Sequence, residues 1–313
     1  MSTLTLNSKT SLTLSVRQWV ASHPFIAYFL LAFGGTWLLD LPIVLGRDGL
    51  GLLPYRMPFI LYAAIFLAGS YAGPTLAALL VTATLEGKAG VHRFLRRYGQ
   101  WRVGVRWYLV ILVGYPLFSL GLVSLGLGGV PLQALRTHWI PLFTLYLPAL
   151  LIFPAIINWG EEAGWRGFAQ TRLQIEYGAL KTSLLVGFAH GVWHLPVFLL
   201  VEGPAAMGPL HPWVFARNTL DIMLITIIWT WLFNRAQGSI LIASLSHAAW
   251  NATQAWVGAM VPNLPKQVGS VSLNDIATLI FFVVALSIIL ATKGRLGYQP
   301  VAKNEEEELN DHG

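Results

Sequence analysis

Three short stretches place ionisable or strongly polar side chains inside otherwise apolar sequence. The first contains two adjacent carboxylates, with an arginine one helical turn after the second of them. The other two each contain a pair of polar side chains four residues apart. In chain order these residues are Glu161, Glu162 and Arg166, then His190 and His194, then His247 and Asn251. An ionisable group at membrane depth costs roughly 2.5–3.5 kcal/mol on insertion scales, so a functional role is the first interpretation of each stretch.

These residue types are the ones that an acyl hydrolase needs. A carboxylate can act as a general base that takes a proton from water. A histidine can orient that water, or bind a metal that acidifies it. An imidazole and an amide on a further helix can donate hydrogen bonds to a developing oxyanion. The chain has no cysteine and no His-Glu-x-x-His motif, which excludes a cysteine nucleophile and a zinc site of that class.

Residues four apart lie on one face of a helix, so each stretch presents its polar groups together. Three polar faces on separate membrane helices need a common polar interior, because lipid would leave them unsatisfied. We therefore expect one shared site. Arg166 can be the counter-ion of Glu162 one turn away, and this leaves Glu161 as the better candidate for the base. The spacing alone leaves open whether His190 or His194 faces the site.

The composition of the chain predicts the elements that position these groups. Of the 313 residues, 55% are hydrophobic and 11% are charged, and the mean hydropathy is +0.61. A soluble domain carries about 25% charged residues, so we predict an all-α, polytopic membrane helical bundle. Apolar runs of about 20 residues, the length that spans a bilayer, predict about eight transmembrane helices. They lie near 24–46, 57–84, 105–127, 138–158, 179–201, 213–233, 239–260 and 273–292. After Asn158 the fourth span is expected to continue as a helix to about Leu173.

The distribution of charge predicts the orientation of the bundle. Eight spans put both termini on one side, and most of the 20 lysines and arginines fall on that side. Cytoplasmic loops carry the excess of positive residues, so both termini are expected in the cytoplasm. The chain then divides into a cytoplasmic N-terminal tail (1–22), a transmembrane bundle (23–293) with the polar stretches at about 140–255, and an acidic C-terminal tail (294–313). The net charge of +6 indicates no nucleic-acid partner, because the positive residues lie in loops between apolar spans.

Two smaller features add to this prediction. In the basic stretch 85–106, aromatic and aliphatic residues alternate with arginines. This pattern suits an amphipathic helix on an anionic leaflet, or it serves only to set the topology. Arg217 and Asp221 are four residues apart near the start of the sixth span, and we expect them to pair with each other.

The three stretches together resemble the CPBP intramembrane proteases, a family that includes type II CAAX prenyl proteases and proteins similar to lysostaphin resistance protein A. The resemblance covers roughly residues 140–255. It is carried by Gly160-Glu-Glu-Ala-Gly-Trp-Arg-Gly-Phe168, Trp193-His-Leu-Pro-Val-Phe198 and Ser246-His-Ala-Ala-Trp-Asn-Ala252. Three motifs in order at compatible spacing are far more specific than any one alone.

The resemblance implies a role for each matching residue. Glu161 would activate water, Glu162 and Arg166 would complete the first motif and orient the site, His194 would work with Glu161 on the water or a metal, and His247 and Asn251 would stabilise the oxyanion. Family members usually have an aromatic residue four positions before the histidine of the second motif. Here that position is His190. The flanking Trp-His-Leu-Pro favours His194 as the family histidine.

The resulting prediction is an intramembrane endopeptidase that cleaves a membrane-associated peptide or protein. Its partners are that substrate and the lipid bilayer, and its location is the plasma membrane, as a multi-pass protein of bacterial type. Two mechanisms stay open, one with a divalent metal such as zinc and one that is a metal-free glutamate protease. Two other functions stay open as well. The Glu/His cluster can relay protons or metal in a transporter, or the chain can be a non-catalytic family member that acts as a membrane scaffold.

Overall fold

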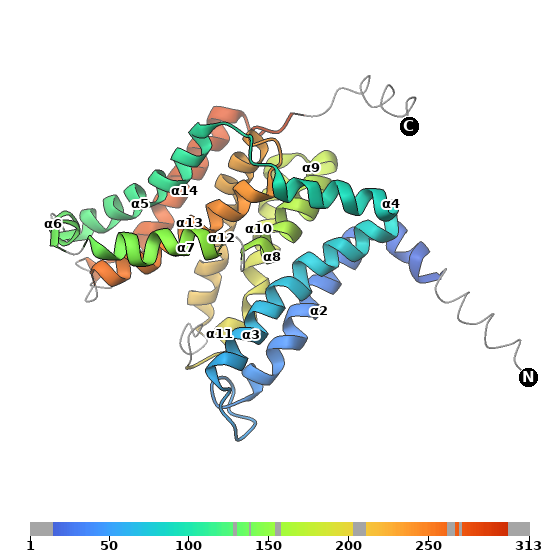
Figure 1. Cartoon of the computed structure of the whole chain (residues 1–313), viewed down its shortest axis with the longest axis horizontal. Helices are drawn as coiled ribbons and strands as arrows, with labels where there is room; N and C mark the ends of the chain where they lie inside the picture. Colours follow the sequence, from blue (N-terminus) through green and yellow to red (C-terminus); the bar gives the residue numbers. More distant parts are fainter. Residues whose placement is uncertain are drawn as a thin grey trace, which may run out of the picture.

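The structure is a computed structural model that describes residues 15–127, 130–137, 139–153, 158–202, 211–261, 267–268 and 271–299. Long helices pack side by side and carry nearly all of these residues (Figure 1). The all-α prediction is therefore confirmed. The described part of the chain has one small exception, a two-residue antiparallel pairing of β1 (Gln267–Val268) with β2 (Val271–Ser272).

The helices follow one another in a simple order. They are α2 (Pro24–Leu45), α3 (Phe59–Ser70), the π-helix η1 (Tyr71–Thr75), α4 (Leu76–Arg96), the 3₁₀ helix η2 (Arg97–Gly99), α5 (Val105–Leu127), α6 (Val130–Thr137), the π-helix η3 (Leu142–Tyr146), α7 (Leu147–Phe153), α8 (Trp159–Glu162), the π-helix η5 (Ala163–Gln170), α9 (Thr171–Tyr177), α10 (Ala179–Trp193), α11 (Leu195–Phe198), α12 (Pro212–Arg235), α13 (Ile240–Met260) and α14 (Leu273–Thr292). Residues 15–22 are also helical.

Four of the described helical runs are long and apolar enough to cross a membrane. They are Pro24–Leu45, Phe59–Gly99, Val105–Ser124 and Leu273–Thr292. This supports the membrane character of the bundle. The count of eight spans and the cytoplasmic position of both termini stay predictions. The helix expected after Asn158 is present, because α8, η5 and α9 continue without a break to Tyr177. Its junction with the fourth span falls on residues 154–157, outside the described residues.

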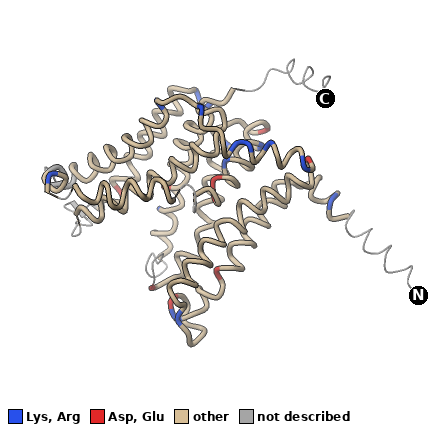
Figure 2. Tube along the Cα trace, in the orientation of Figure 1, with Lys and Arg blue, Asp and Glu red and all other residues tan. Residues whose placement is uncertain are grey.

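The long run Phe59–Gly99 bends sharply at Gly87, whose φ of 64° and ψ of −157° are accessible to glycine (Figure 1). The part after the bend carries much of the predicted basic stretch, and lysines and arginines gather there (Figure 2). Arg97 at its end donates hydrogen bonds to the carbonyls of Gly167 and Gly238 at 2.9 Å and to Thr171 Oγ1 at 3.0 Å. The basic segment is thereby joined to η5, to α9 and to the turn between α12 and α13.

The segment with the two carboxylates packs directly against the backbone of η1. A Cβ atom added to Gly160 would lie 3.0 Å from the Ser70 carbonyl, and one added to Gly164 would lie 2.4–2.6 Å from Pro74. No larger residue fits at these two positions without moving the backbone. Thr75 Oγ1 also donates a hydrogen bond to the Gly160 carbonyl at 2.6 Å. The position of α8 is therefore set by a close helix contact of the kind that small residues allow in membranes.

The site lies between elements of two apolar core clusters. One cluster joins α5, α7, α12 and α13, and the other joins α2, α4, η5 and α10. The three polar stretches come from segments of both clusters. The histidine pair lies at the end of α10 and the His247 stretch lies on α13. The core therefore holds these segments in fixed relative positions.

Arg217 and Asp221 do not form the direct ion pair that was predicted, because each has a closer partner on α14. Arg217 Nη1 lies 3.5 Å from Asp275 Oδ1 on α14, and Asp221 accepts a hydrogen bond from Thr278 Oγ1 at 2.6 Å. Both contacts link α12 to α14. The helix neighbour provides closer partners than the same helix does, and sequence spacing cannot show this.

Candidate active site

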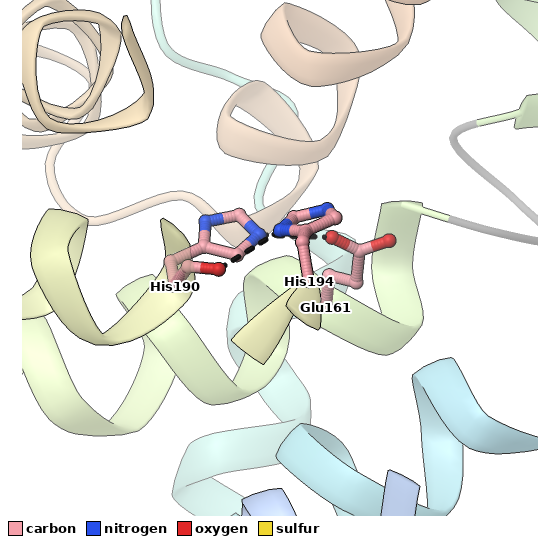
Figure 3. Close-up of side chains that lie close together, drawn as sticks. All are labelled: Glu161, His190 and His194. Carbon is pink, nitrogen blue, oxygen red and sulfur yellow. Dashed lines mark hydrogen bonds and ion pairs between the residues drawn. The ribbon is translucent and has the colours of Figure 1, made fainter. Parts of the chain in front are cut away.

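Glu161, His190 and His194 converge in one cluster (Figure 3). Glu161 lies on α8, His190 lies in the last turn of α10, and His194 is the residue that ends α10. His190 Nε2 is 3.1 Å from Glu161 Oε2, and one nitrogen or oxygen atom from each of the three side chains lies within 4.8 Å of the others. Both histidines therefore face the site, since both lie beside Glu161.

Glu162 has a separate set of partners. Arg166 Nη1 lies 3.1 Å from its carboxylate, and His247 Nδ1 lies 2.9 Å from Oε1. The side chains of Glu162 and Arg166 are both 0% exposed. The ion pair expected from the one-turn spacing is therefore present and completely buried. A buried carboxylate needs such a partner, since an unpaired charge costs several kcal/mol in this environment.

Two residues of α12 that the sequence did not single out complete the surroundings of Arg166. Its Nη2 donates a hydrogen bond to Thr226 Oγ1 at 2.9 Å. Its guanidinium lies 4.9 Å from the centre of the Trp229 ring, and the same ring lies 4.6 Å from the His247 ring. Nothing in the sequence pattern distinguishes this threonine and this tryptophan from other residues of an apolar helix.

A hydrogen-bond network from α2 fixes the end of α10, where His194 lies. Trp193 Nε1 donates to Thr36 Oγ1 at 2.9 Å, and Thr36 Oγ1 donates to the Gly69 carbonyl at 2.7 Å. Trp37 Nε1 donates to the Trp193 carbonyl at 2.9 Å. This network was also missed at the level of sequence. In the sequence, its only trace is the presence of Thr36 and Trp37 in the first apolar span. Nothing there indicates a partner 156 residues away.

Asn251 lies one turn after His247 on α13 and is partly buried. Among the described residues, none forms a hydrogen bond with the Asn251 amide, whereas His247 contacts Glu162. The structure thus brings Glu161, Glu162, Arg166, His194 and His247 together with His190, and Asn251 lies on the same helix as His247, one turn later. The amide remains available to a ligand.

The donor set of the Glu161 cluster suits a divalent ion. Carboxylate oxygen and imidazole nitrogen are usual ligands of zinc. His194 Nδ1 lies 2.8 Å from the His190 carbonyl, and this contact orients the imidazole in the way that metal-binding histidines are commonly oriented. Glu161 and His194 therefore offer two ligands of the types that such a metal prefers, with His190 next to them.

The arrangement can perform hydrolysis. Glu161 is 6% exposed and His194 is partly exposed, so this side of the site is closer to solvent than Glu162. A carboxylate beside imidazoles can accept a proton from water, and a second imidazole with an amide can stabilise negative charge on a substrate oxygen. Together, fold and site define an all-helical protein with long apolar helices and a buried cluster of carboxylates and histidines.

The comparisons with known proteins agree with this class. Residues 140–253 match the family described as type II CAAX prenyl endopeptidase Rce1-like, a range that includes all three polar stretches. The chain is also 25% identical over 237 residues to "CAAX prenyl protease 2" of Methanococcus maripaludis, which covers 74% of this chain and 83% of that protein. The two matches support the assignment of the chain to the CPBP family of intramembrane proteases. They also support the assignment of the chain as an intramembrane endopeptidase of the CAAX prenyl protease type.

Proposed function

We propose that this chain cleaves a peptide bond of a membrane-associated peptide or protein, with Glu161 as the base that takes a proton from the attacking water. The observation that carries this proposal is the difference between two adjacent carboxylates. The Glu162 carboxylate is bound by Arg166 and His247. The Glu161 carboxylate faces two imidazoles on the side nearer to solvent. A base must have a free oxygen within reach of water.

The other residues divide into two functions in this proposal. His194 acts with Glu161 on the water, because the residue is partly exposed and its imidazole is oriented by a backbone carbonyl. Glu162 and Arg166 hold the first motif in place from a completely buried position. His247 and Asn251 stabilise the oxyanion. His247 Nδ1 is directed at Glu162, so an imidazolium there would donate through Nε2, and Glu162 would stabilise its charge.

A divalent cation such as zinc would be held by Glu161 and His194, with His190 next to them. Such an ion lowers the pKa of a bound water and polarises a carbonyl. The oxyanion donors and the buried ion pair would be supplied by the chain itself in either mechanism.

The substrate proposed here is a peptide or protein in the lipid bilayer, and the location is the plasma membrane. The curated relative is named for CAAX prenyl protease activity. An assay should therefore offer the same peptide with and without a C-terminal prenyl group, so that the prenyl requirement and the peptide-bond cleavage are measured separately.

The test uses the purified full chain in lipid nanodiscs and a fluorogenic peptide. We expect Glu161→Ala and His194→Ala to abolish cleavage while both variants remain inserted and folded. Matched controls are Glu176→Ala and His92→Ala, which change exposed residues of the same types outside the site. Near-wild-type cleavage by either site variant would show that these roles are assigned wrongly.

A chelator experiment distinguishes the two mechanisms. Loss of cleavage after chelation, with recovery on addition of zinc, supports the metal-dependent mechanism. Unchanged cleavage after complete removal of divalent metal, checked by elemental analysis, supports the metal-free glutamate mechanism.

A further inference from the structure

The resemblance to the CPBP proteases puts His190 at a position where that family usually has an aromatic residue. His190 is 1% exposed. The imidazole stacks on the Trp165 ring, with ring centres 5.0 Å apart and planes inclined by 26°, and it lies 5.0 Å from the His194 ring. The ring packing of an aromatic residue is therefore kept here. What the histidine adds is two nitrogen atoms in a completely buried place.

Both nitrogens of His190 have polar neighbours. Nε2 lies 3.1 Å from Glu161 Oε2, and Nδ1 lies 3.5 Å from Arg166 Nη1. An arginine side chain has only donors, so Nδ1 must be the accepting nitrogen. A neutral imidazole has one N–H and one lone pair, which places the hydrogen on Nε2. His190 therefore donates a hydrogen bond to Glu161.

His194 has the opposite arrangement. Its Nδ1 lies 2.8 Å from the backbone carbonyl of His190, and a carbonyl can only accept. The hydrogen is therefore on Nδ1, and Nε2 has the lone pair. His194 is partly exposed, whereas His190 is buried. Of the two adjacent imidazoles, one presents a hydrogen to Glu161 and the other keeps a lone pair for water or a cation.

We infer that His190 is a positioning residue that holds the Glu161 carboxylate through its Nε2–H and is not a ligand of a divalent cation at this site. Its single lone pair, on Nδ1, is directed at Arg166. The hydrogen bond occupies Oε2 of Glu161, fixes the rotamer of the carboxylate and leaves Oε1 for the water. The kinetic consequence of this inference rests on the proposed function. The position of the hydrogen and the choice of metal ligands do not depend on it.

Direct evidence for the hydrogen position comes from ¹⁵N NMR of the protein labelled at histidine. The signals of His190 are assigned by their loss in His190→Phe. We expect a neutral imidazole with hydrogen on Nε2 for His190 and on Nδ1 for His194. Hydrogen on Nδ1 of His190 would overturn the inference.

The ligand question is tested by titrating chelator-treated protein with Co²⁺ and recording its visible absorption. His190→Phe keeps the stacked ring but removes both nitrogens, and His194→Phe is the matched comparison. We expect His190→Phe to bind Co²⁺ as wild type does and His194→Phe to bind it at least about ten-fold more weakly. Equal weakening by both variants would make His190 a ligand and overturn the inference. Absence of Co²⁺ binding to wild-type protein agrees with it.

The positioning role predicts a specific kinetic result. In His190→Phe, kcat should fall about ten-fold with KM nearly unchanged, because a donor to a charged carboxylate is lost while the packing remains. His190→Gln supplies an N–H near the place of Nε2 and should recover most of the lost turnover. A KM effect with unchanged kcat, or no recovery with glutamine in a folded variant, would contradict the role. If wild-type protein cleaves no peptide, the proposed function fails, while the NMR and Co²⁺ results still decide the inference.

Discussion

Glu161 and Glu162 are neighbours in sequence but have opposite surroundings. Glu162 is 0% exposed and its charge is neutralised by Arg166 and His247. Glu161 is 6% exposed and lies beside two histidines at the end of α10, of which His194 is a partly exposed residue. Successive residues of a helix point about 100° apart, so the two carboxylates face different helices. The difference indicates that adjacent acids in one motif can separate into a reactive group and a structural group.

The largest effect is expected for Glu161→Gln, which keeps the size and one polar contact of the side chain. Peptide cleavage should fall about a thousand-fold, because a general base contributes about 10²–10⁴ to the rate. Thermal unfolding should change little. The measurement is kcat in nanodiscs together with circular dichroism on heating. If this variant unfolded easily and kept its specific activity, Glu161 would be the structural carboxylate and not the reactive one.

For Glu162→Gln we expect the main loss in stability. Arg166 would lose its buried counter-ion, and breaking one partner of such a pair costs about 3–5 kcal/mol. The matched control is Glu86→Gln, since Glu86 pairs with Arg93 and Arg172 near the surface, where an ion pair contributes about 1 kcal/mol or less. The free energy of unfolding of both variants can be measured in mixed detergent. Equal losses of unfolding free energy would mean that burial does not make the Glu162–Arg166 pair more important for stability than the Glu86 pairs.

Asn251→Ala is expected to lower kcat about a hundred-fold while changing substrate affinity less, as loss of one oxyanion donor does. The reason is that its amide has no hydrogen bond to the described residues and would act only on the substrate. Steady-state kinetics check this result. Unchanged turnover with weaker affinity would move Asn251 to a role in substrate binding.

The smallest effect is expected for Thr226→Val, which removes the hydrogen bond to Arg166 Nη2 and keeps the shape of the side chain. Unfolding should be easier by about 1–3 kcal/mol, because a buried donor of a charged group is left unsatisfied. Thr230→Val, on the same helix and bonded to the neutral Gln170, is the control with a smaller loss. A larger loss at Thr230 would show that Thr226 does not support the Glu162 side of the site.

Local features of the site were predictable from sequence, and contacts between distant segments were not. The Glu162–Arg166 pair follows from helix geometry alone, and the convergence of three polar stretches follows from the cost of polar groups in lipid. The contact of His190 with Glu161 spans 29 residues and depends on how α10 packs against α8. For the same reason Arg217 contacts Asp275 rather than Asp221.

The fold shows the same limit. Apolar runs of spanning length predicted the helices because length and hydropathy are properties of each segment alone. The π-helices η1 and η5 have no distinguishing pattern in the sequence, and they lie against each other where Gly164 of η5 allows Pro74 of η1 to approach. Thr226 and Trp229 became recognisable only once their helix lay against Arg166.

The bend at Gly87 determines the direction of the basic end of a long helical run. As a straight helix, the 41 residues of Phe59–Gly99 would extend about 60 Å, twice the hydrocarbon core of about 30 Å. The glycine ends the crossing and turns the basic remainder across the end of the bundle (Figure 1). A residue at this position that favoured a straight helix would direct the basic segment away from the bundle, and Arg97 would lose its hydrogen bonds to the carbonyls of Gly167 and Gly238. One glycine thus divides a single long run into an apolar helix and a basic segment that lies against the other helices.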